Sequence, residues 1–421
     1  MQFLNFLKLL APFILAIAIP FSRSSADLAI ILFSIAFLFK SYFENNWDWV
    51  SEKWLIAGLI FFTYCFFINS SLSIDPYESA KYSIYFLRWP LFAVACAYWI
   101  LSDHNTLRNF LIVMTAVVGF LILDTWYQFF LGYDIFGRQI FSDHNLERLT
   151  GPFRRPYVGM WITKLIILPL FFFVFFEKYQ KFLNSKYFFY FLILFLCIFF
   201  STIFITGERM ALIMSLLQIF IILVGLFLSK CISIYRILII FILFFFIFTF
   251  FFFIYPDHFE RAISSSLYKI INWKISDYGM VWRSAYDVWM ESPLFGAGLH
   301  QYRDACSQLG FYGNVDSPIS SGVCFHPHNL SMQLLSETGV TGFILFFIMV
   351  FYISENIFER SFNKKEWLTF SLMLTIIVAC FLPIQSNTDF FSNKYSSIVW
   401  LLIGVSLALV KLKQNINSKN I

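Results

Sequence analysis

Apolar runs of about 17–25 residues recur along the whole 421-residue chain, and their length limits the folds that the chain can adopt. A helix of that length crosses the roughly 30 Å hydrocarbon core of a bilayer and satisfies its backbone hydrogen bonds internally. With 59% hydrophobic and 13% charged residues, a soluble domain would expose large apolar patches. We therefore predict an all-α polytopic membrane protein. About twelve spans are expected, near residues 6–22, 27–43, 54–71, 83–101, 108–131, 158–176, 187–205, 210–228, 235–255, 329–353, 367–384 and 395–410.

The placement of Lys and Arg predicts the orientation, because basic residues in short loops stay on the cytoplasmic side. With the N-terminus inside, the cytoplasmic segments would hold most of these residues: Lys8, Lys40, Lys53, Arg108, Lys178, Lys181, Lys186, Lys230, Arg236, Arg360, Lys364, Lys365, Lys411, Lys413 and Lys419. The opposite short loops would hold Arg23, Lys81, Arg209 and Lys394. We therefore expect both termini in the cytoplasm. The first span should be retained, since no small-residue cleavage pattern follows it.

Two outward segments are long enough to fold over the membrane surface, residues 132–157 and the longer stretch 256–328. The expected organisation is transmembrane helices 1–9 in residues 1–255, a periplasmic loop domain in 256–328, and helices 10–12 with a cytoplasmic C-terminus in 329–421. The net charge of +5 is spread over many loops. This spread of charge forms no dense basic patch, so we expect membrane lipids as surroundings and no nucleic-acid partner.

Local signals predict structure within the long loop. Residues 278–291 read as an amphipathic helix along the membrane interface, with aromatic residues at i, i+4 and i+7. Residues 293–298, Pro-Leu-Phe-Gly-Ala-Gly, end it with turn chemistry. The next span opens at Asn329, a favourable N-cap, which puts His328 just before the positive end of that helix.

Cys306 and Cys324 share the long outer loop, whereas the other five cysteines lie in or beside spans. If the loop faces an oxidising compartment, these two can form a disulfide that holds His326 and His328 against the loop body. Two free thiols are the alternative.

The most informative segment is His326-Pro327-His328-Asn329, followed by nine residues and then Gly339-Val340-Thr341-Gly342. Here the chain resembles the O-antigen ligase family of bacterial inner-membrane glycosyltransferases, whose signature is a His-Asn pair at a helix start, nine residues and Gly-x-x-Gly. The two glycines are expected to allow close helix contact, a structural role. Further similar stretches are residues 151–156, 206–209, 283–289 and 293–298.

The resemblance implies a GT-C-like fold and a glycan-transfer reaction. A glycan carried on undecaprenyl pyrophosphate would move to a hydroxyl of the lipid A core or another acceptor, at the periplasmic face of the inner membrane. The family uses no cofactor, metal or nucleotide sugar. An O-antigen polymerase or a protein O-oligosaccharyltransferase of the same superfamily is the alternative. A polysaccharide or lipid transporter is more remote, since it would show ionisable residues inside several spans or a repeat architecture.

Two arginines are expected to hold the pyrophosphate, where negative charge builds as the sugar carbon departs. Arg209 lies in a minimal outer turn between two apolar runs, and its planar guanidinium suits two-point phosphate contact. Its alternatives are snorkelling to the interface or a pair with Glu208. Arg283 matches the family's loop arginine, and its alternative is a helix pair with Asp287.

Three more arginines are predicted to bind substrate. Arg154 and Arg155 precede a return into the membrane and are expected to meet lipid phosphate or glycan, with general surface electrostatics as the alternative. Arg88, in the fourth span, is expected near an interface, where it would line the donor site.

The resemblance implies that His328 is the catalytic base. The chemistry agrees, because an imidazole can be neutral near pH 7 and a helix N-terminus favours its neutral form. A charged His328 that contacts phosphate, or a histidine with a purely structural role as a cap or core residue, is the alternative. His326 and Asn329 are expected to support substrate binding. A metal site is the competing use of the two histidines, but the loop adds only His300 and scattered Asp residues as ligands. Glu337 should lie on the opposite helix face from His328, given their nine-residue offset.

Overall fold

The computed structural model describes residues 2–143, 146–183, 185–256, 260–310, 324, 326–383 and 389–418, and these are almost entirely helical. Two short strands, β1 (Phe141–Asp143) and β2 (Leu146–Arg148), pair antiparallel with Phe141 opposite Arg148. The predicted class, an all-α polytopic membrane protein, is confirmed.

Among the described residues, eleven helical stretches are long and apolar enough to cross a membrane. They are built from α1 (Gln2–Phe21), α2 (Arg23–Glu44), α3 (Lys53–Tyr64), α4 (Pro76–Phe86) with α5 (Arg88–Ala95), α6 (His104–Leu131), α7 (Val158–Leu165) with α8 (Ile167–Phe175), α10 (Lys186–Ile205), α11 (Arg209–Leu228), α12 (Ile234–Ile254), α17 (Leu330–Asn363) and α19 (Asn393–Ser418). A further apolar helix, α18 (Trp367–Phe381), is shorter, at 15 residues. Each of the predicted runs overlaps one of these helices.

The remaining helices connect or extend the spans. The α-helices among them are α9 (Glu177–Leu183), α14 (Ser265–Ile271), α15 (Asp277–Glu291) and α16 (Tyr302–Gln308). Short 3-10 or π-helical turns are η1 (Asp48–Ser51), η2 (Cys65–Asn69), η3 (Ser70–Leu72), η4 (Cys96–Ile100), η5 (Glu260–Ser264) and η6 (Trp273–Ile275). The turns η2 and η3 continue α3 to Leu72, and η4 continues α5 to Ile100.

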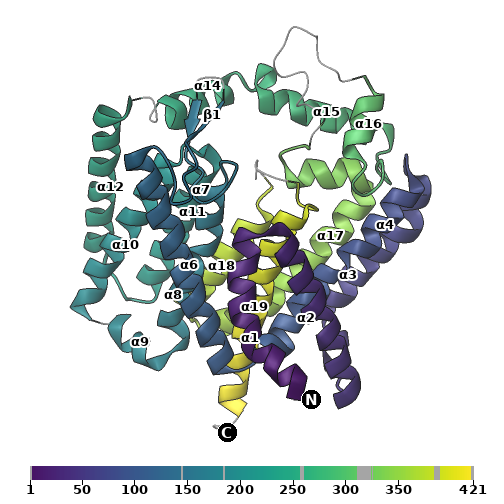
Figure 1. The fold of residues 1–421 in the computed structure, drawn as a ribbon, viewed down its shortest axis with the longest axis horizontal. Helices are drawn as coiled ribbons and strands as arrows, with labels where there is room; N and C mark the ends of the chain where they lie inside the picture. The colour runs from purple at the N-terminus through teal and green to yellow at the C-terminus, as the bar shows by residue number, and fades with distance from the viewer. Residues whose placement is uncertain are drawn as a thin grey trace.

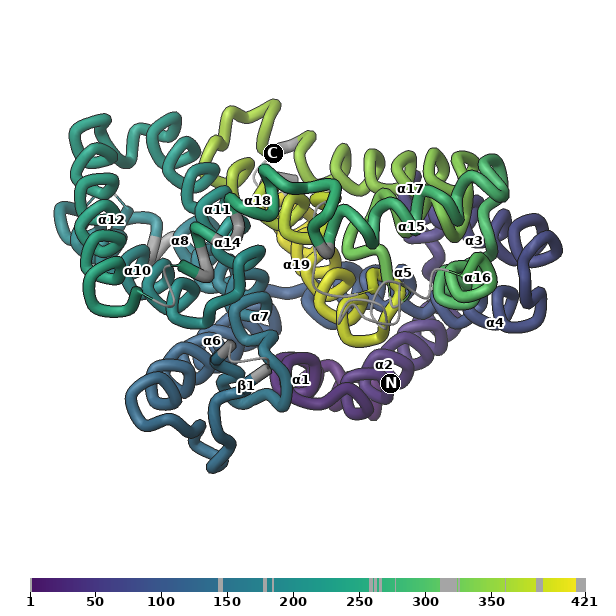
Figure 2. The backbone as a smooth tube through the Cα atoms, turned by 90° about the horizontal axis from the view of Figure 1, so that it is seen from above, coloured from purple at the N-terminus to yellow at the C-terminus, as the bar shows by residue number. Residues whose placement is uncertain are grey.

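The most buried span is α19, which lies in the middle of the bundle, while α12 lies at its edge (Figures 1 and 2). In the apolar window of α19, 94% of the residues are buried, against 17% in α12. The phenylalanine-rich α12 therefore presents most of its surface outward, as lipid-facing bulk.

Both chain termini lie at one end of the bundle, and β1, α14, α15 and α16 lie at the other, which we call the loop end (Figure 1). Helices α2, α4, α7, α11, α17 and α19 begin at the loop end, so their first residues lie on that side of the bundle. The assignment of the loop end to the periplasm stays a prediction.

Two prolines interrupt membrane-spanning helices, and one of these interruptions determines the position of Arg88. Proline lacks an N–H donor, and its ring clashes with the carbonyl four residues earlier. Accordingly, α4 ends at Phe86, four residues before Pro90, and α7 ends at Leu165, four residues before Pro169. Arg88 consequently sits at a bend of the fourth span instead of in an unbroken helix.

The amphipathic helix predicted over residues 278–291 is α15, which begins one residue earlier. Ser276 caps it by accepting a hydrogen bond from the backbone N–H of Gly279 at 3.2 Å. Its buried side carries small residues and packs against α16 and α17. These residues are Val281, Ser284, Ala285 and Val288. The bulky aromatic side chains are left nearer the surface, and Tyr286 is 46% exposed.

Candidate active site at the loop end

The turn at residues 293–298 docks onto a break in α17. The backbone N–H groups of Ala297 and Gly298 donate to the carbonyls of Ser336 and Glu337, each at 2.9 Å. The break lies at Gly339, whose φ of 65° and ψ of −175° are non-helical. A Cβ atom there would stand 2.4 Å from the backbone of Leu294. The close contact predicted for Gly339 is therefore with the backbone of this turn. A Cβ atom at Gly342 would meet the Thr338 side chain at 2.3 Å and Tyr64 of α3 at 3.1 Å.

Asn69, at the end of η2, ties the turn to α17 and was missed by the sequence reasoning. Its side-chain amide donates to the carbonyls of Phe295 at 2.7 Å and Glu337 at 2.9 Å, and its oxygen accepts from the N–H of Leu299 at 2.9 Å. The side chain is fully buried. A lone amide at the end of an apolar run was the available signal, since a buried amide needs hydrogen-bond partners.

His300 follows this turn and is held on three sides. Its backbone has a φ of 65°, and its N–H donates to Oε2 of Glu337 at 3.1 Å. Its ring packs against Tyr82, with the ring centroids 3.9 Å apart and the ring planes tilted by 33°. Its Nδ1 lies 3.5 Å from Oδ2 of Asp389. Burial by itself lowers the pKa of His300, but the hydrogen bond and the charge of Asp389 outweigh it, so the pKa is raised above its usual value.

Asp389 is fixed just before α19 by donors other than His300. The N–H of Phe391 donates to Oδ1 at 2.8 Å, and the side-chain amide of Gln333 donates to the same oxygen. Burial alone raises the pKa of Asp389, yet the hydrogen bonds from His300 and Gln333 bring it below its usual value. Glu337 faces Gln333 and His300, as its offset from His328 predicted.

His326 and His328 lie against each other at the start of α17, with ring centroids 3.8 Å apart. The N–H of His328 donates to Nδ1 of His326 at 3.1 Å, and His328 has a positive φ of 51°. Burial and nearby His328 lower the pKa of His326 to about 3, so His326 is a neutral acceptor. Asn329 caps α17, because its Oδ1 accepts from the N–H groups of Ser331 and Met332 at 2.9 and 3.2 Å.

Arg209 is the first residue of α11 and directly follows the buried carboxyl group of Glu208. That carboxylate accepts from the N–H groups of Gly159 and Met160 at 2.7 and 3.1 Å, at the start of α7. Burial raises the pKa of Glu208 to about 7, although both hydrogen bonds favour its charged form. Glu208 thus accepts hydrogen bonds from the start of α7, which gives it a role besides the pair with Arg209 that was the alternative to phosphate binding.

The loop arginines lie on the surface. Arg283 is exposed on α15, and in the described part of the chain it forms no ion pair with Asp287. Arg154 and Arg155 are exposed in the segment before α7, and the guanidinium of Arg155 lies 5.6 Å from the ring centroid of Phe141. All three are therefore accessible to a ligand at the membrane surface, while their binding roles stay predictions.

Arg88 lies in a pocket at the loop end. Its guanidinium contacts Asp27 near the start of α2 at 3.2 Å and Asn393 at the start of α19 at 2.9 Å. Arg23, Lys81, His300 and Asp389 line the same pocket. Among these five residues, Arg88 alone is predicted from the sequence to bind substrate. Arg23 and Lys81 carried a signal nonetheless, because they are two of the few basic residues outside the segments predicted as cytoplasmic.

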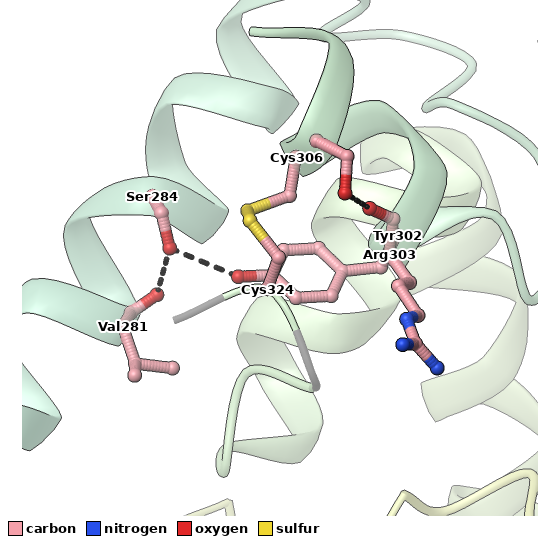
Figure 3. Close-up of a disulfide and its surroundings, with 7 residues drawn as sticks. Val281, Ser284, Tyr302, Arg303, Cys306 and Cys324 are labelled. Carbon is pink, nitrogen blue, oxygen red and sulfur yellow. Dashed lines mark hydrogen bonds between the residues drawn. A yellow bond between two sulfur atoms is a disulfide. The ribbon is translucent and has the colours of Figure 1, made fainter. Parts of the chain in front are cut away.

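Cys306 of α16 and Cys324 form a disulfide with an S–S distance of 2.02 Å (Figure 3). Beside it, the hydroxyls of Ser284 on α15 and Tyr302 on α16 lie 2.9 Å apart in a buried contact. Since Cys324 precedes His326 by two residues, the disulfide connects the histidine segment to the core formed by α15 and α16.

These features define a polytopic membrane protein with a polar, histidine- and arginine-containing site at one end of its helices. Residues 192–347 match the family model described as O-Antigen ligase, which confirms the family resemblance seen in the sequence. The matched segment contains Arg209, Arg283 and His328, and members of this family are ligase-type glycosyltransferases. No curated protein matches the chain.

Proposed function

We propose that the protein is an O-antigen ligase-type glycosyltransferase. It would transfer a polysaccharide from undecaprenyl pyrophosphate to a hydroxyl of the lipid A core, at the periplasmic face of the bacterial inner membrane. The observation that carries this proposal is His328 at the capped start of α17, within the segment that matches the family. The domain division at residues 256 and 329 belongs to the same proposal, with the loop as one wall of the site.

In the proposed mechanism, the acceptor oxygen attacks the anomeric carbon of the donor sugar. The bond from that carbon to the pyrophosphate oxygen breaks, and undecaprenyl pyrophosphate leaves with the bonding electrons. His328 takes the proton of the acceptor hydroxyl. Arg209 and Arg283 stabilise the charge that develops on the pyrophosphate. Since a pyrophosphate is already a good leaving group, Arg209 and Arg283 need only position it and balance its charge.

Neutral His326 supports the role of His328 in this scheme. Its Nδ1 accepts the backbone N–H of His328, which fixes the backbone from which the His328 ring projects. The ring of Tyr278 on α15 meets His328 edge-on at 6.1 Å. A base held by neighbours on two elements loses little conformational entropy when substrate binds.

The test is complementation of a bacterial strain that lacks its own ligase, followed by analysis of its lipids. The wild-type chain should restore long polymer on the lipid A core, whereas His328→Ala and Arg209→Ala should leave the polymer on undecaprenyl pyrophosphate at equal protein level. Restored transfer by both variants would refute the mechanism. Single capped repeats would instead indicate a polymerase, glycosylated protein an oligosaccharyltransferase, and an unchanged profile a transporter.

A further inference from the structure

A cavity of about 310 Å³ opens at the loop end between α2, the α4–α5 bend and the start of α19. Three of the described side chains that line it are basic and charged near neutral pH, namely Arg23, Lys81 and Arg88. Tyr82, Tyr85 and Trp89 add aromatic surface, and His300 and Asp389 form another part of the wall. The combination of aromatic surface with a few placed charges is typical of a ligand site.

The charges of this pocket do not cancel. Arg88 forms an ion pair with Asp27 at 3.2 Å, and a carboxylate oxygen of Asp389 lies 3.5 Å from Nδ1 of His300. Lys81 contacts Glu78 at 2.9 Å, outside the pocket lining. Arg23 is exposed at the start of α2 and has no ion pair within the described residues. The lining therefore has an excess of positive charge, which attracts an anion.

His300 is oriented to take part in binding. Its Nδ1 faces Asp389, so Nε2 is the ring nitrogen that is left for a ligand. The ring contact with Tyr82 restricts the imidazole, and the hydrogen bond from the His300 backbone N–H to Glu337 fixes the backbone that carries it. A carboxylate on one imidazole nitrogen determines the tautomer and direction of the other, as in many binding and catalytic sites.

The pocket is largely separate from the segment that matches the family. Of the described residues that line it, only His300 falls within residues 192–347; the others come from the first five helices and from residues 389–393. Arg209, Arg283 and His328 do not line it. The family match therefore assigns no role to this cavity.

We propose that the pocket is an additional phosphate subsite, in which Arg23, Lys81 and Nε2 of His300 bind a phosphate or pyrophosphate group of a membrane-anchored glycolipid. The inference rests on the proposed function for the identity of that glycolipid. The phosphate could belong to the donor lipid or to a phosphorylated acceptor core, and both present the same chemistry to these side chains. Arginine is well suited to this contact because its planar fork matches phosphate oxygens.

The test measures binding of inorganic pyrophosphate to the full chain in lipid nanodiscs by calorimetry. All variants carry Arg209→Ala, so that the Arg209 region contributes no binding of its own. Arg23→Gln and His300→Gln should each weaken binding at least about tenfold, or about 1.4 kcal/mol. The matched controls are Arg108→Gln and His104→Gln, exposed side chains on the first turns of α6 at the opposite end, which should bind as before.

Because Arg23 is exposed, its variant should fold normally, and size-exclusion profiles check this for both variants. Unchanged binding in Arg23→Gln and His300→Gln would overturn the proposal, and so would weakening by His300→Gln alone. Calorimetry measures pyrophosphate binding without glycan transfer. If the protein transfers no glycan, the proposed function is refuted, but the binding result still holds.

Transfer assays with native Arg209 then distinguish the two sources of phosphate. A raised KM for the donor in Arg23→Gln, at unchanged acceptor KM, identifies the donor pyrophosphate. A raised KM for a phosphorylated acceptor, absent with a phosphatase-treated acceptor, identifies the acceptor phosphate. Unchanged KM values for donor and acceptor would overturn a substrate role for the pocket.

Discussion

The Nδ1 atom of His300 lies 3.5 Å from Oδ2 of Asp389, although one residue follows the turn that docks on α17 and the other precedes α19. This contact links the loop to the last span at the wall of the basic pocket. It also joins two groups whose charges depend on each other, because Asp389 stabilises the protonated form of His300.

We predict that Asp389→Asn shifts the pH dependence of pyrophosphate binding to lower pH. The pKa of His300 is raised, so its positive charge is present at low pH and lost as the pH rises through that value. Without the carboxylate at position 389 the pKa of His300 falls, so His300 loses its positive charge at a lower pH. The other groups acting on His300 are Glu337 and Asp304, while Arg23, Lys81 and Arg88 keep their charge near neutral pH.

Titration calorimetry between about pH 5 and 8 measures this shift, a range in which histidine is the side chain that ordinarily titrates. Asp304→Asn is the matched control, since Asp304 contributes least among the groups acting on His300. Identical profiles for wild type and Asp389→Asn would show that the contact does not control binding.

We predict that His328→Ala lowers the transfer rate by a factor of about 10² or more, the usual contribution of a general base. The change should appear in kcat, because the group acts on the reacting hydroxyl. Exposed His104→Ala, at the other end of the bundle, should retain full activity. A His328→Ala enzyme with wild-type kcat would require another base.

We predict that Gly339→Ala destabilises the protein by about 1–3 kcal/mol, since its φ of 65° and ψ of −175° are accessible essentially to glycine alone. The new Cβ would also meet the Leu294 backbone at 2.4 Å. The matched control is Gly119→Ala in α6, where nothing lies within 4 Å of the added carbon. That change should be neutral or stabilising, as alanine favours helix. Thermal unfolding in detergent compares the variants, and equal losses in both would argue against the docked turn.

We predict that Cys306→Ser lowers stability by roughly 3 kcal/mol, because the disulfide closes a short loop and restricts the unfolded chain. Transfer activity should fall as well, since the bond holds the segment just before His326. Cys197→Ser, at a free cysteine in α10, should change neither property. Thermal unfolding and transfer assays measure both effects, and full activity of Cys306→Ser would separate the disulfide from the site.

Much of the fold was predictable because its signals are local. Span length and hydropathy located each of the long apolar helices in the described part of the chain. Asn329 marked the start of α17 through a capping preference that acts over three residues. The pattern around His328 indicated a resemblance to the family, and residues 192–347 match that family's model. The break of α17 at Gly339 was not predicted, because it results from a turn that docks from another part of the chain.

The amino-acid sequence by itself located the apolar helices, the start of α17 and the family resemblance of its histidine segment, since each depends on residues close together in the chain. Only the tertiary structure decided that Asn69 clamps the turn at residues 293–298, and that His300 meets Asp389 beside Arg23. Hydropathy predicts that a helix enters the membrane, but it does not predict which other helices pack beside it. Side-chain packing determines which helices are neighbours, and it brings together polar groups that are far apart in the sequence.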